Sequence, residues 1–157
     1  MSKTTPATLA LTKAGAAFTL AHYDYDPNAE RVGLQAAEAM GVSPAEVFKT
    51  LMAELDGKPV CAILPSDEEV NMKKLAAALG GKSAQMMKPA DAERLTGYKV
   101  GGISPLGQRK PVPAALDELA TLHDAIFLNG GQRGLQIRIR PDDLVAVLGC
   151  VVADLVR

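Results

Sequence analysis

One lysine occupies an unexpected position in a predicted strand. Val47, Lys49, Leu51, Ala53 and Leu55 share one face of the segment 47–55, and only the lysine among them is charged. An ammonium group that points toward a core loses hydration, so it requires water, a partner or a ligand. A functional lysine in a cleft satisfies that requirement. A lysine near a strand end that extends along the surface to solvent satisfies it as well.

A glycine-rich segment over residues 97–107, GYKVGGISPLG, is the second candidate. Clustered glycines allow backbone N–H groups to approach a carbonyl, carboxylate or phosphate closely, and Ser104 could add a hydroxyl donor. The glycine spacing matches neither the P-loop nor the dinucleotide-binding fingerprint. A tight loop whose glycines adopt positive φ explains the same composition without a ligand.

A third glycine cluster, NGGQRG over residues 129–134, lies between two apolar runs and predicts a second hairpin. Turn geometry alone accounts for its glycines. It therefore indicates function only in combination with the other two segments.

Other common catalytic groups form no recognisable pattern. The two histidines, His22 and His123, stand apart, and neither the Gly-x-Ser-x-Gly nor the His-Glu-x-x-His motif occurs. Cys61 and Cys150 lie far apart in apolar surroundings, which predicts buried thiols rather than a metal site or a disulfide. A nucleophilic role for either thiol has no supporting signature. We therefore expect neither a metal nor a cofactor.

The elements around these residues predict one domain over residues 1–157. Strands at 47–55 and 59–64 flank an Asp56-Gly57 turn, and strands at 126–129 and 135–139 flank the third glycine cluster. Helices are predicted between and after these hairpins, without strict β-α-β alternation. This order favours an α+β fold with a mixed, mostly antiparallel sheet.

The charge balance excludes a strong general attraction to nucleic acid or to an anionic membrane. Seventeen basic residues face eighteen acidic ones, for a net charge of −1. Contact with RNA must therefore come from a local site or a delivering partner. The sequence has neither a signal-peptide pattern nor an apolar run that could span a bilayer, so we expect a cytoplasmic protein with no membrane partner.

Three segments in a fixed order, VFKTL at 47–51, GYKVGGISPLG at 97–107 and GGQRGL at 130–135, resemble the YbaK/EbsC family of aminoacyl-tRNA deacylases. That family is related to the editing domain of bacterial prolyl-tRNA synthetase. The resemblance extends over nearly the whole chain, from the opening helix and strand to the closing helix and strand. It implies a compact α+β fold with a curved, mostly antiparallel sheet flanked by helices, and hydrolysis of cysteine mischarged onto proline tRNA, Cys-tRNA(Pro).

The resemblance also implies roles for individual residues. Lys49 corresponds to the family's central functional lysine. The positions that correspond to substrate-binding residues are Tyr23, Thr50, Gly101, Gly102, Ile103, Ser104, Pro105, Asn129, Gly130, Gly131 and Gln136. Two of these depart from the family pattern, because Asn129 stands where a serine is frequent and Gln136 where some relatives carry an aspartate. The second change removes a carboxylate that could assist a water molecule.

Ester cleavage needs a stabiliser for the oxyanion and an activated nucleophile. We expect backbone N–H groups of Gly101 and Gly102 to supply the first. The resemblance implies that the thiol of the substrate attacks its own carbonyl and releases a cyclic thioester, with no metal or cofactor. Lys49 would then position the 3′-terminal adenosine or its phosphate.

Three functions remain open from the sequence. The first is a free-standing trans-editing deacylase for Cys-tRNA(Pro), with aminoacylated tRNA(Pro) and possibly prolyl-tRNA synthetase as partners. The second is a deacylase for alanine or another small residue, whose relatives tend to carry a Val-Thr-Pro-Phe-like loop where this chain has ISPL at 103–106. The third is a non-catalytic module that binds tRNA or a synthetase.

Overall fold

The computed structural model describes residues 4–28 and 31–157. Within them the strands form two sheets. The three-stranded sheet has the order β1-β7-β6, with β1 at Thr19–His22, β7 at Leu135–Ile139 and β6 at Ile126–Asn129. The five-stranded sheet has the order β4-β2-β3-β5-β8, with β4 at Ala84–Met86, β2 at Phe48–Leu55, β3 at Lys58–Pro65, β5 at Ala114–Asp117 and β8 at Val151–Ala153.

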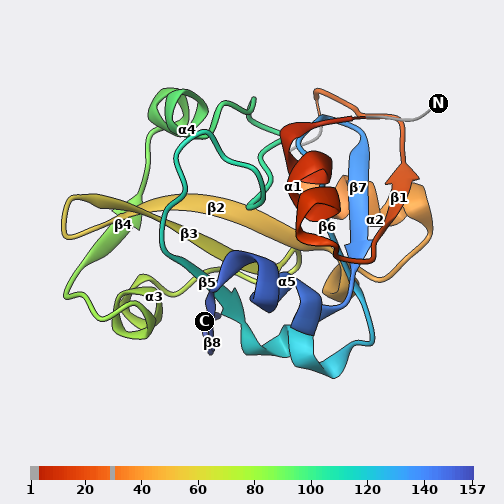
Figure 1. Ribbon diagram of the computed structural model, residues 1–157. Coiled ribbons are helices and arrows are strands. Elements are labelled where there is room, and N and C mark those ends of the chain that lie inside the picture. The colour runs from red at the N-terminus through yellow and green to blue at the C-terminus, as the bar shows by residue number, and fades with distance from the viewer. Residues whose placement is uncertain (1–3, 29–30) are drawn as a thin grey trace.

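Helices surround these sheets (Figure 1). They are α1 at Pro6–Ala14, α2 at Val32–Met40, α3 at Met72–Ala78, α4 at Pro89–Thr96 and α5 at Pro141–Leu148, with short 3₁₀ helices at Pro44–Glu46 and Glu118–Leu122. Side-chain caps mark several starts: Thr5 accepts a hydrogen bond from the backbone N–H of Thr8, and Asn71 accepts from the first turn of α3. No helix in the described part of the chain is long and apolar enough to cross a membrane.

The β2–β3 hairpin follows the predicted turn chemistry. Asp56 and Gly57 have φ values of 51° and 84°, which a two-residue turn of the favoured hand requires. The turn pairs Leu55 with Lys58 and sets the register back to Phe48 opposite Pro65. β6 and β7 also pair antiparallel, with Asn129 opposite Gln136. Both predicted hairpins are therefore confirmed.

The predicted α+β class and mostly antiparallel pairing are confirmed. β3–β5 and β5–β8 are parallel, whereas the other strand pairs are antiparallel. The division into two sheets is not predicted by the sequence. The sheets meet at a bridge between Val47 and Phe127, where the start of β2 passes alongside β6.

Both faces of β2 are covered by other parts of the protein. The alternation in the sequence had indicated only one apolar face. Phe48 and Met52 pack into the largest core cluster with side chains of α1 and α5. Ala53, on the opposite face, packs into a second cluster with Leu75 of α3. A strand buried on both faces has a nearly continuous apolar sequence. Lys49 and Thr50 therefore interrupt both faces of β2 at the same point.

Candidate active site

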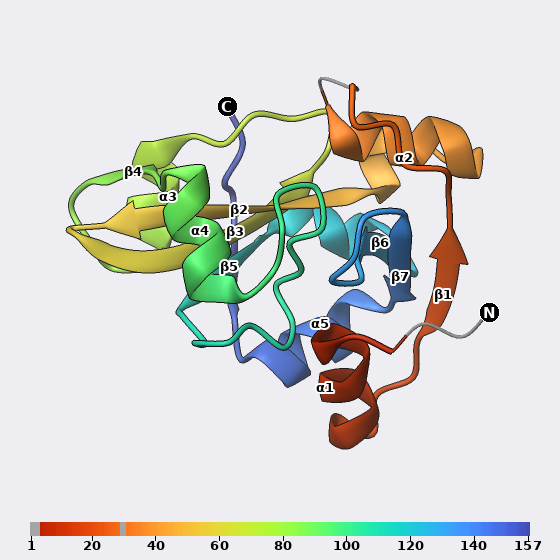
Figure 2. The same ribbon diagram turned by 90° about the horizontal axis from the view of Figure 1, so that it is seen from above.

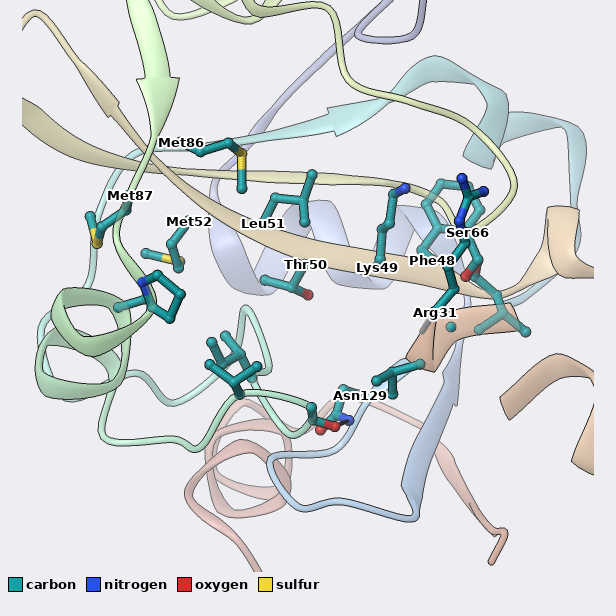
Figure 3. A pocket seen from close by; sticks show the side chains of 18 of the residues that line it. Arg31, Phe48, Lys49, Thr50, Leu51, Met52, Ser66, Met86, Met87 and Asn129 are labelled. Carbon is teal, nitrogen blue, oxygen red and sulfur yellow. Dashed lines mark hydrogen bonds between the residues drawn. The ribbon is translucent and has the colours of Figure 1, made fainter. Parts of the chain in front are cut away.

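A cavity of about 440 Å³ opens along the edge of β2 (Figure 3). β4 pairs only with the last part of β2, at residues 53–55. The earlier part, from Phe48 to Met52, therefore has no strand neighbour on that side among the described residues once β2 has passed the bridge to β6. Seen from above, α4, the loop after it and the β6–β7 hairpin lie along the same side of β2 (Figure 2).

The backbone of β2 directs polar groups into this open edge. In a two-residue hairpin the residues that flank the turn exchange hydrogen bonds, and the pattern then alternates along the strand. Two contacts agree with that alternation: the N–H of Met87 donates to the Met52 carbonyl at 3.1 Å on the outer side, and the N–H of Ser66 donates to the Val47 carbonyl at 2.8 Å on the inner side. Thr50 lies two residues before Met52, so its N–H and C=O point to the same outer side of β2 and face the cavity.

Lys49 and Thr50 project to opposite sides of β2, as neighbouring strand residues must (Figure 3). The cavity extends around the strand edge, so both residues line it. One side carries the ammonium group of Lys49 and the guanidinium group of Arg31. The other side carries the hydroxyl group of Thr50.

The side of Lys49 and Arg31 is cationic. Burial lowers the pKa of the half-buried Lys49, and the charge of Arg31 lowers it further, against weaker opposite effects of Glu69, Asp67 and Glu68. Glu69 also lines the cavity, but its carboxylate is paired with Arg157 at 3.1 Å. Neither Lys49 nor Arg31 forms an ion pair with any of the residues described. Two cations that have no ion-pair partner in the described part of the chain suit an anionic group such as a phosphate.

Arg31 is a site residue that the sequence analysis missed. It directly precedes α2 and stands at the N-cap position without a side-chain cap hydrogen bond, and Val32 and Gly33 of the first turn line the cavity with it. The N-terminus of α2, which is the positive end of the helix dipole, therefore lies at the same opening. The sequence shows the helix, but the contact with Lys49 depends on tertiary packing.

On the other side of β2, Asn129 connects the glycine-rich loop to the β6–β7 hairpin. Its amide nitrogen donates to the Gly101 carbonyl at 3.0 Å, and its amide oxygen accepts from the N–H groups of Gly131 at 2.7 Å and Gln132 at 3.2 Å. These contacts hold the loop against the hairpin. They use both the nitrogen and the oxygen of the Asn129 amide. A serine hydroxyl at the same position would make these contacts less easily.

Gly101 requires its lack of a side chain. Its φ is +90°, and a Cβ there would lie 2.7 Å from the hydroxyl of Tyr25. The guanidinium group of Arg133 stacks over the Tyr25 ring, 5.3 Å from the ring centre. The Nε of Arg133 also donates a hydrogen bond to the Val100 carbonyl at 2.9 Å. Tyr25 and Arg133 were not among the predicted site residues, and they hold the loop from outside.

The sequence between residues 26 and 147 matches the family model of the aminoacyl-tRNA editing domain. The chain belongs to this family. It is an aminoacyl-tRNA deacylase of the YbaK/EbsC group, as the three ordered motifs predict.

Individual relatives agree with this assignment. A protein of Enterococcus faecalis, described as a candidate Cys-tRNA(Pro)/Cys-tRNA(Cys) deacylase and named EbsC, is 38% identical over 112 residues, which cover 71% of this chain and 68% of that protein. The proline–tRNA ligase of Acidithiobacillus ferrooxidans is 33% identical over 90 residues, which cover 57% of this chain but only 16% of the ligase. A crystal structure described as a candidate trans-editing enzyme for prolyl tRNA synthetase superimposes with a TM-score of 0.84 at 26% identity, over 99% of both chains.

The editing domain brings together part of the predicted site. Lys49, Thr50, Gly101, Ile103, Asn129 and Gln136 all line the cavity. Tyr23 lies behind this wall, buried, with its backbone N–H donating to the Gly134 carbonyl at 2.9 Å. Gly102, Ser104, Pro105, Gly130 and Gly131 are not lining residues of the cavity.

Two expectations about the glycine-rich loop were wrong. The Gly102 N–H is not available to a substrate, because it donates to the Lys99 carbonyl at 2.8 Å within the turn. Ser104 is fully buried, and its hydroxyl accepts a hydrogen bond from the Leu106 N–H at 3.2 Å inside the loop. The loop therefore shapes the cavity wall but does not supply the expected pair of donors.

The far end of the cavity is apolar and rich in sulfur. Met52, Met86 and Met87 lie there with Pro89 and Ala92 of α4 (Figure 3). Met86 belongs to β4, a three-residue strand that the sequence analysis did not predict. Methionine side chains adapt to irregular shapes and contact aromatic rings favourably, so this end suits an apolar or aromatic group.

The predicted buried thiols are confirmed. Cys61 and Cys150 are free and buried, and burial raises the pKa of Cys61 to about 12. In the parts of the chain that the structure describes, no group of three or more His, Cys, Asp or Glu residues is placed to hold a metal ion. The polar side chains that line the cavity include Lys49, Arg31, Thr50, Asn129 and Gln136.

Proposed function

We propose that this editing domain acts in trans to remove cysteine from mischarged proline tRNA, Cys-tRNA(Pro). The relative from Enterococcus faecalis that carries this description supports the choice of substrate. Proline and cysteine are similar in size, so a synthetase pocket that relies on packing rejects cysteine only weakly. A separate site that cleaves the wrong ester then maintains accuracy.

The observation that carries the proposal is the two-sided cavity at the edge of β2. Lys49 and Arg31 on one side suit the phosphate and ribose of the 3′-terminal adenosine. The enclosed side with Thr50, Asn129 and Gln136 suits the small aminoacyl group. The edge of β2 lies between them, where the ester bond would be held.

The proposed chemistry needs no protein nucleophile. The thiol of the bound cysteine attacks its own carbonyl carbon, and the C–O bond to the ribose breaks. The proton that leaves the sulfur is taken up by the ribose oxygen, and the amino acid is released as a cyclic thioester that water later opens. Lys49 acts in this scheme as a cation that positions the terminal nucleotide.

Delivery by a synthetase is part of the proposal. The editing region of proline–tRNA ligases belongs to the same polypeptide as their other domains, as the 16% coverage of the ligase indicates. This domain, with a net charge of −1, has little general attraction for tRNA. Prolyl-tRNA synthetase with bound tRNA(Pro) would supply the substrate at high local concentration.

The test follows loss of the ester bond from proline tRNA charged with cysteine, alanine, serine or proline. We expect rapid loss of cysteine and slow loss of the other three. Rates equal to the protein-free rate for all four would contradict an enzymatic role and support a binding module. Preferential loss of alanine would support the alternative of a deacylase for another small residue.

The serine substrate tests thiol assistance separately. Serine has the shape of cysteine with a hydroxyl in place of the thiol, and a hydroxyl at neutral pH is a much weaker nucleophile. If serine is released as fast as cysteine, the thiol does not assist the reaction.

A further inference from the structure

Tyr25 and Arg133 form a stack at the rim of the cavity, and the proposed cleavage does not use them. The guanidinium group of Arg133 lies over the half-buried Tyr25 ring, 5.3 Å from the ring centre. Arg133 is exposed and forms no ion pair within residues 4–28 and 31–157, although Asp24 and Asp26 flank Tyr25 in the sequence. A cation that is held over a ring and has no anionic partner is ready to contact a ligand of opposite charge.

Hydrogen bonds attach the Tyr25–Arg133 stack to the wall of the cavity. The Nε of Arg133 donates to the Val100 carbonyl at 2.9 Å, and the N–H of Val100 donates to the Glu93 carboxylate at 2.8 Å. Val100 lines the cavity and is also 43% exposed, so it belongs to both the cavity wall and the outer surface. Tyr25 reaches the same wall, because a Cβ on Gly101 would lie 2.7 Å from its hydroxyl oxygen. The stack therefore adjoins the opening of the cavity.

The contact with Val100 leaves most of the Arg133 guanidinium group free. Each of its nitrogens carries N–H donors, and the bond to the Val100 carbonyl uses only the one on Nε. The terminal nitrogens donate to none of the residues that the structure describes, and their spacing matches two oxygens of a phosphate. Because Arg133 is exposed, the face of the guanidinium group that points away from Tyr25 is accessible to a planar group such as a nucleobase.

The tRNA substrate continues beyond the cavity. A tRNA ends in the single strand CCA, and its terminal adenosine carries the amino acid. With that adenosine at Lys49 and Arg31, the cytidine before it lies at the opening of the cavity. Proteins bind unpaired nucleotides by stacking the bases on aromatic rings or guanidinium planes and by placing cations at the phosphates. The Tyr25–Arg133 stack offers both kinds of contact, whereas the net charge of −1 gives no general attraction.

We propose that the Tyr25–Arg133 stack binds the cytidine that precedes the terminal adenosine, with the guanidinium group of Arg133 against the base and its phosphate. This inference rests on the proposed deacylase function and extends its substrate-binding site beyond the cavity. Arg133 is the contact residue. Tyr25 is a positioning residue that holds the guanidinium group in place.

The experiment measures kcat/KM for loss of cysteine from three substrates of increasing length. Cysteine is esterified to the 3′-hydroxyl of adenosine 5′-phosphate, of the dinucleotide pCpA, and of proline tRNA. The shortest substrate keeps the phosphate that Lys49 and Arg31 would hold, but it lacks the cytidine. A contact with the cytidine must therefore affect the two longer substrates and not the shortest one.

Three variants change the stack and one is a control. Arg133→Gln removes the charge and the guanidinium plane, Arg133→Lys keeps the charge alone, and Tyr25→Leu removes the ring. Arg140→Gln is the matched control, because Arg140 is also an exposed arginine but lies beyond the end of β7 that is remote from the β6–β7 turn.

We expect Arg133→Gln to lower kcat/KM by about 5- to 50-fold for the pCpA ester and for tRNA, and to leave the ester of adenosine 5′-phosphate unchanged. The slope of log kcat/KM against log salt concentration should fall by about 0.7 for the longer substrates, which is the effect of one phosphate contact on a single strand. Arg133→Lys should keep the salt slope but not the full kcat/KM, because an ammonium group does not stack. Tyr25→Leu should show a smaller loss with the same dependence on length, and Arg140→Gln should behave as the wild type.

Several results would overturn the inference. An equal loss with all three substrates would show that Arg133 acts only by holding the loop at Val100. Wild-type kcat/KM of Arg133→Gln with every substrate would remove the contact altogether. A loss that occurs only when prolyl-tRNA synthetase delivers the tRNA would assign the stack to a contact with protein.

Binding of uncharged nucleotides tests the contact without turnover. In an NMR titration, pCpA should bind the wild type more tightly than adenosine 5′-phosphate and should shift the signals of the Arg133 Nε and the Tyr25 ring. Arg133→Gln should remove this difference in affinity. Equal binding of both nucleotides to the wild type would overturn the contact. A protein that prefers pCpA in this way but cleaves no ester would support the contact and remove the proposed deacylase function.

Discussion

Replacing Lys49 with methionine should separate activity from stability. Methionine keeps the length and apolar character of the lysine stem, so packing against the strand is retained. The ammonium group is half-buried, it has no ion-pair partner among the described residues, and the charge of Arg31 has the largest effect of any charged group on its pKa. Its desolvation cost is therefore offset only in part, by the weaker effects of Glu69, Asp67 and Glu68. We expect Lys49→Met to raise the free energy of unfolding by up to about 1 kcal/mol.

The same change should lower activity. A hydrogen bond between an ammonium and a phosphate contributes roughly 1.5–3 kcal/mol, which corresponds to roughly 10- to 150-fold in kcat/KM. Loss of one phosphate contact should also reduce the slope of log KM against log salt concentration by about 1. A residue that only supports the fold would change neither the salt slope nor activity in this way.

Chemical denaturation gives the free energy of unfolding, and ester loss at several salt concentrations gives kcat/KM and its slope. Lys58→Met is the matched control, because Lys58 is an exposed lysine of the same hairpin at the turn end of β3. The control should leave both activity and salt slope unchanged. A stable Lys49→Met protein with wild-type kcat/KM and an unchanged salt slope would refute the positioning role. A large loss of stability would refute the expected gain in the free energy of unfolding.

Three further predictions follow from the same contacts. Burial and the charge of Arg31 lower the pKa of Lys49, so activity that needs the ammonium group should be present at neutral pH and disappear as pH rises through a value below the pKa of free lysine. Lys49→Arg should move this loss of activity to higher pH. Both pH profiles are measured after subtraction of spontaneous ester hydrolysis. Cys61 and Cys150 should not react with a thiol reagent in the native state and should both react in denaturant, and rapid native reaction accompanied by loss of activity would contradict the absence of a protein thiol from the mechanism. Asn129→Ala removes one hydrogen bond to the glycine-rich loop and two within the β6–β7 turn, so it should cost roughly 1–3 kcal/mol of stability and raise KM. Unchanged thermal unfolding and KM would show that the loop is held in another way.

Local sequence chemistry predicts much of this fold. The Asp-Gly turn, the capping residues and the proline starts of α1 and α4 each act within a few residues of chain, and the structure follows them. Strand alternation also identifies Lys49 as a charge on an apolar face. These are features in which neighbouring residues alone determine the geometry.

Long-range pairing accounts for what the sequence analysis missed. β4 has the sequence Ala-Gln-Met, which lacks both alternation and β-branched residues, and it is a strand because it pairs with the end of β2. Its short length leaves the rest of the β2 edge open. The cavity therefore depends on where this pairing stops, and no local pattern shows that point.

The same reasoning applies to the site residues. Arg31 precedes a helix and resembles any surface cation in the sequence, until folding places it beside Lys49. Gly102 and Ser104 look available in the sequence, but hydrogen bonds within the loop use the Gly102 N–H and the Ser104 hydroxyl. Polar residues in a compact loop serve first to satisfy that loop's own backbone, and only a structure shows which groups remain free.

The most direct measurement follows single-turnover loss of cysteine from proline tRNA with protein in excess. It compares the wild type, Lys49→Met and a protein-free reaction. We predict that the wild type cleaves the ester many-fold faster than the protein-free reaction and that Lys49→Met loses most of this acceleration while remaining folded. A wild-type rate equal to the protein-free rate, with or without prolyl-tRNA synthetase, would contradict the account.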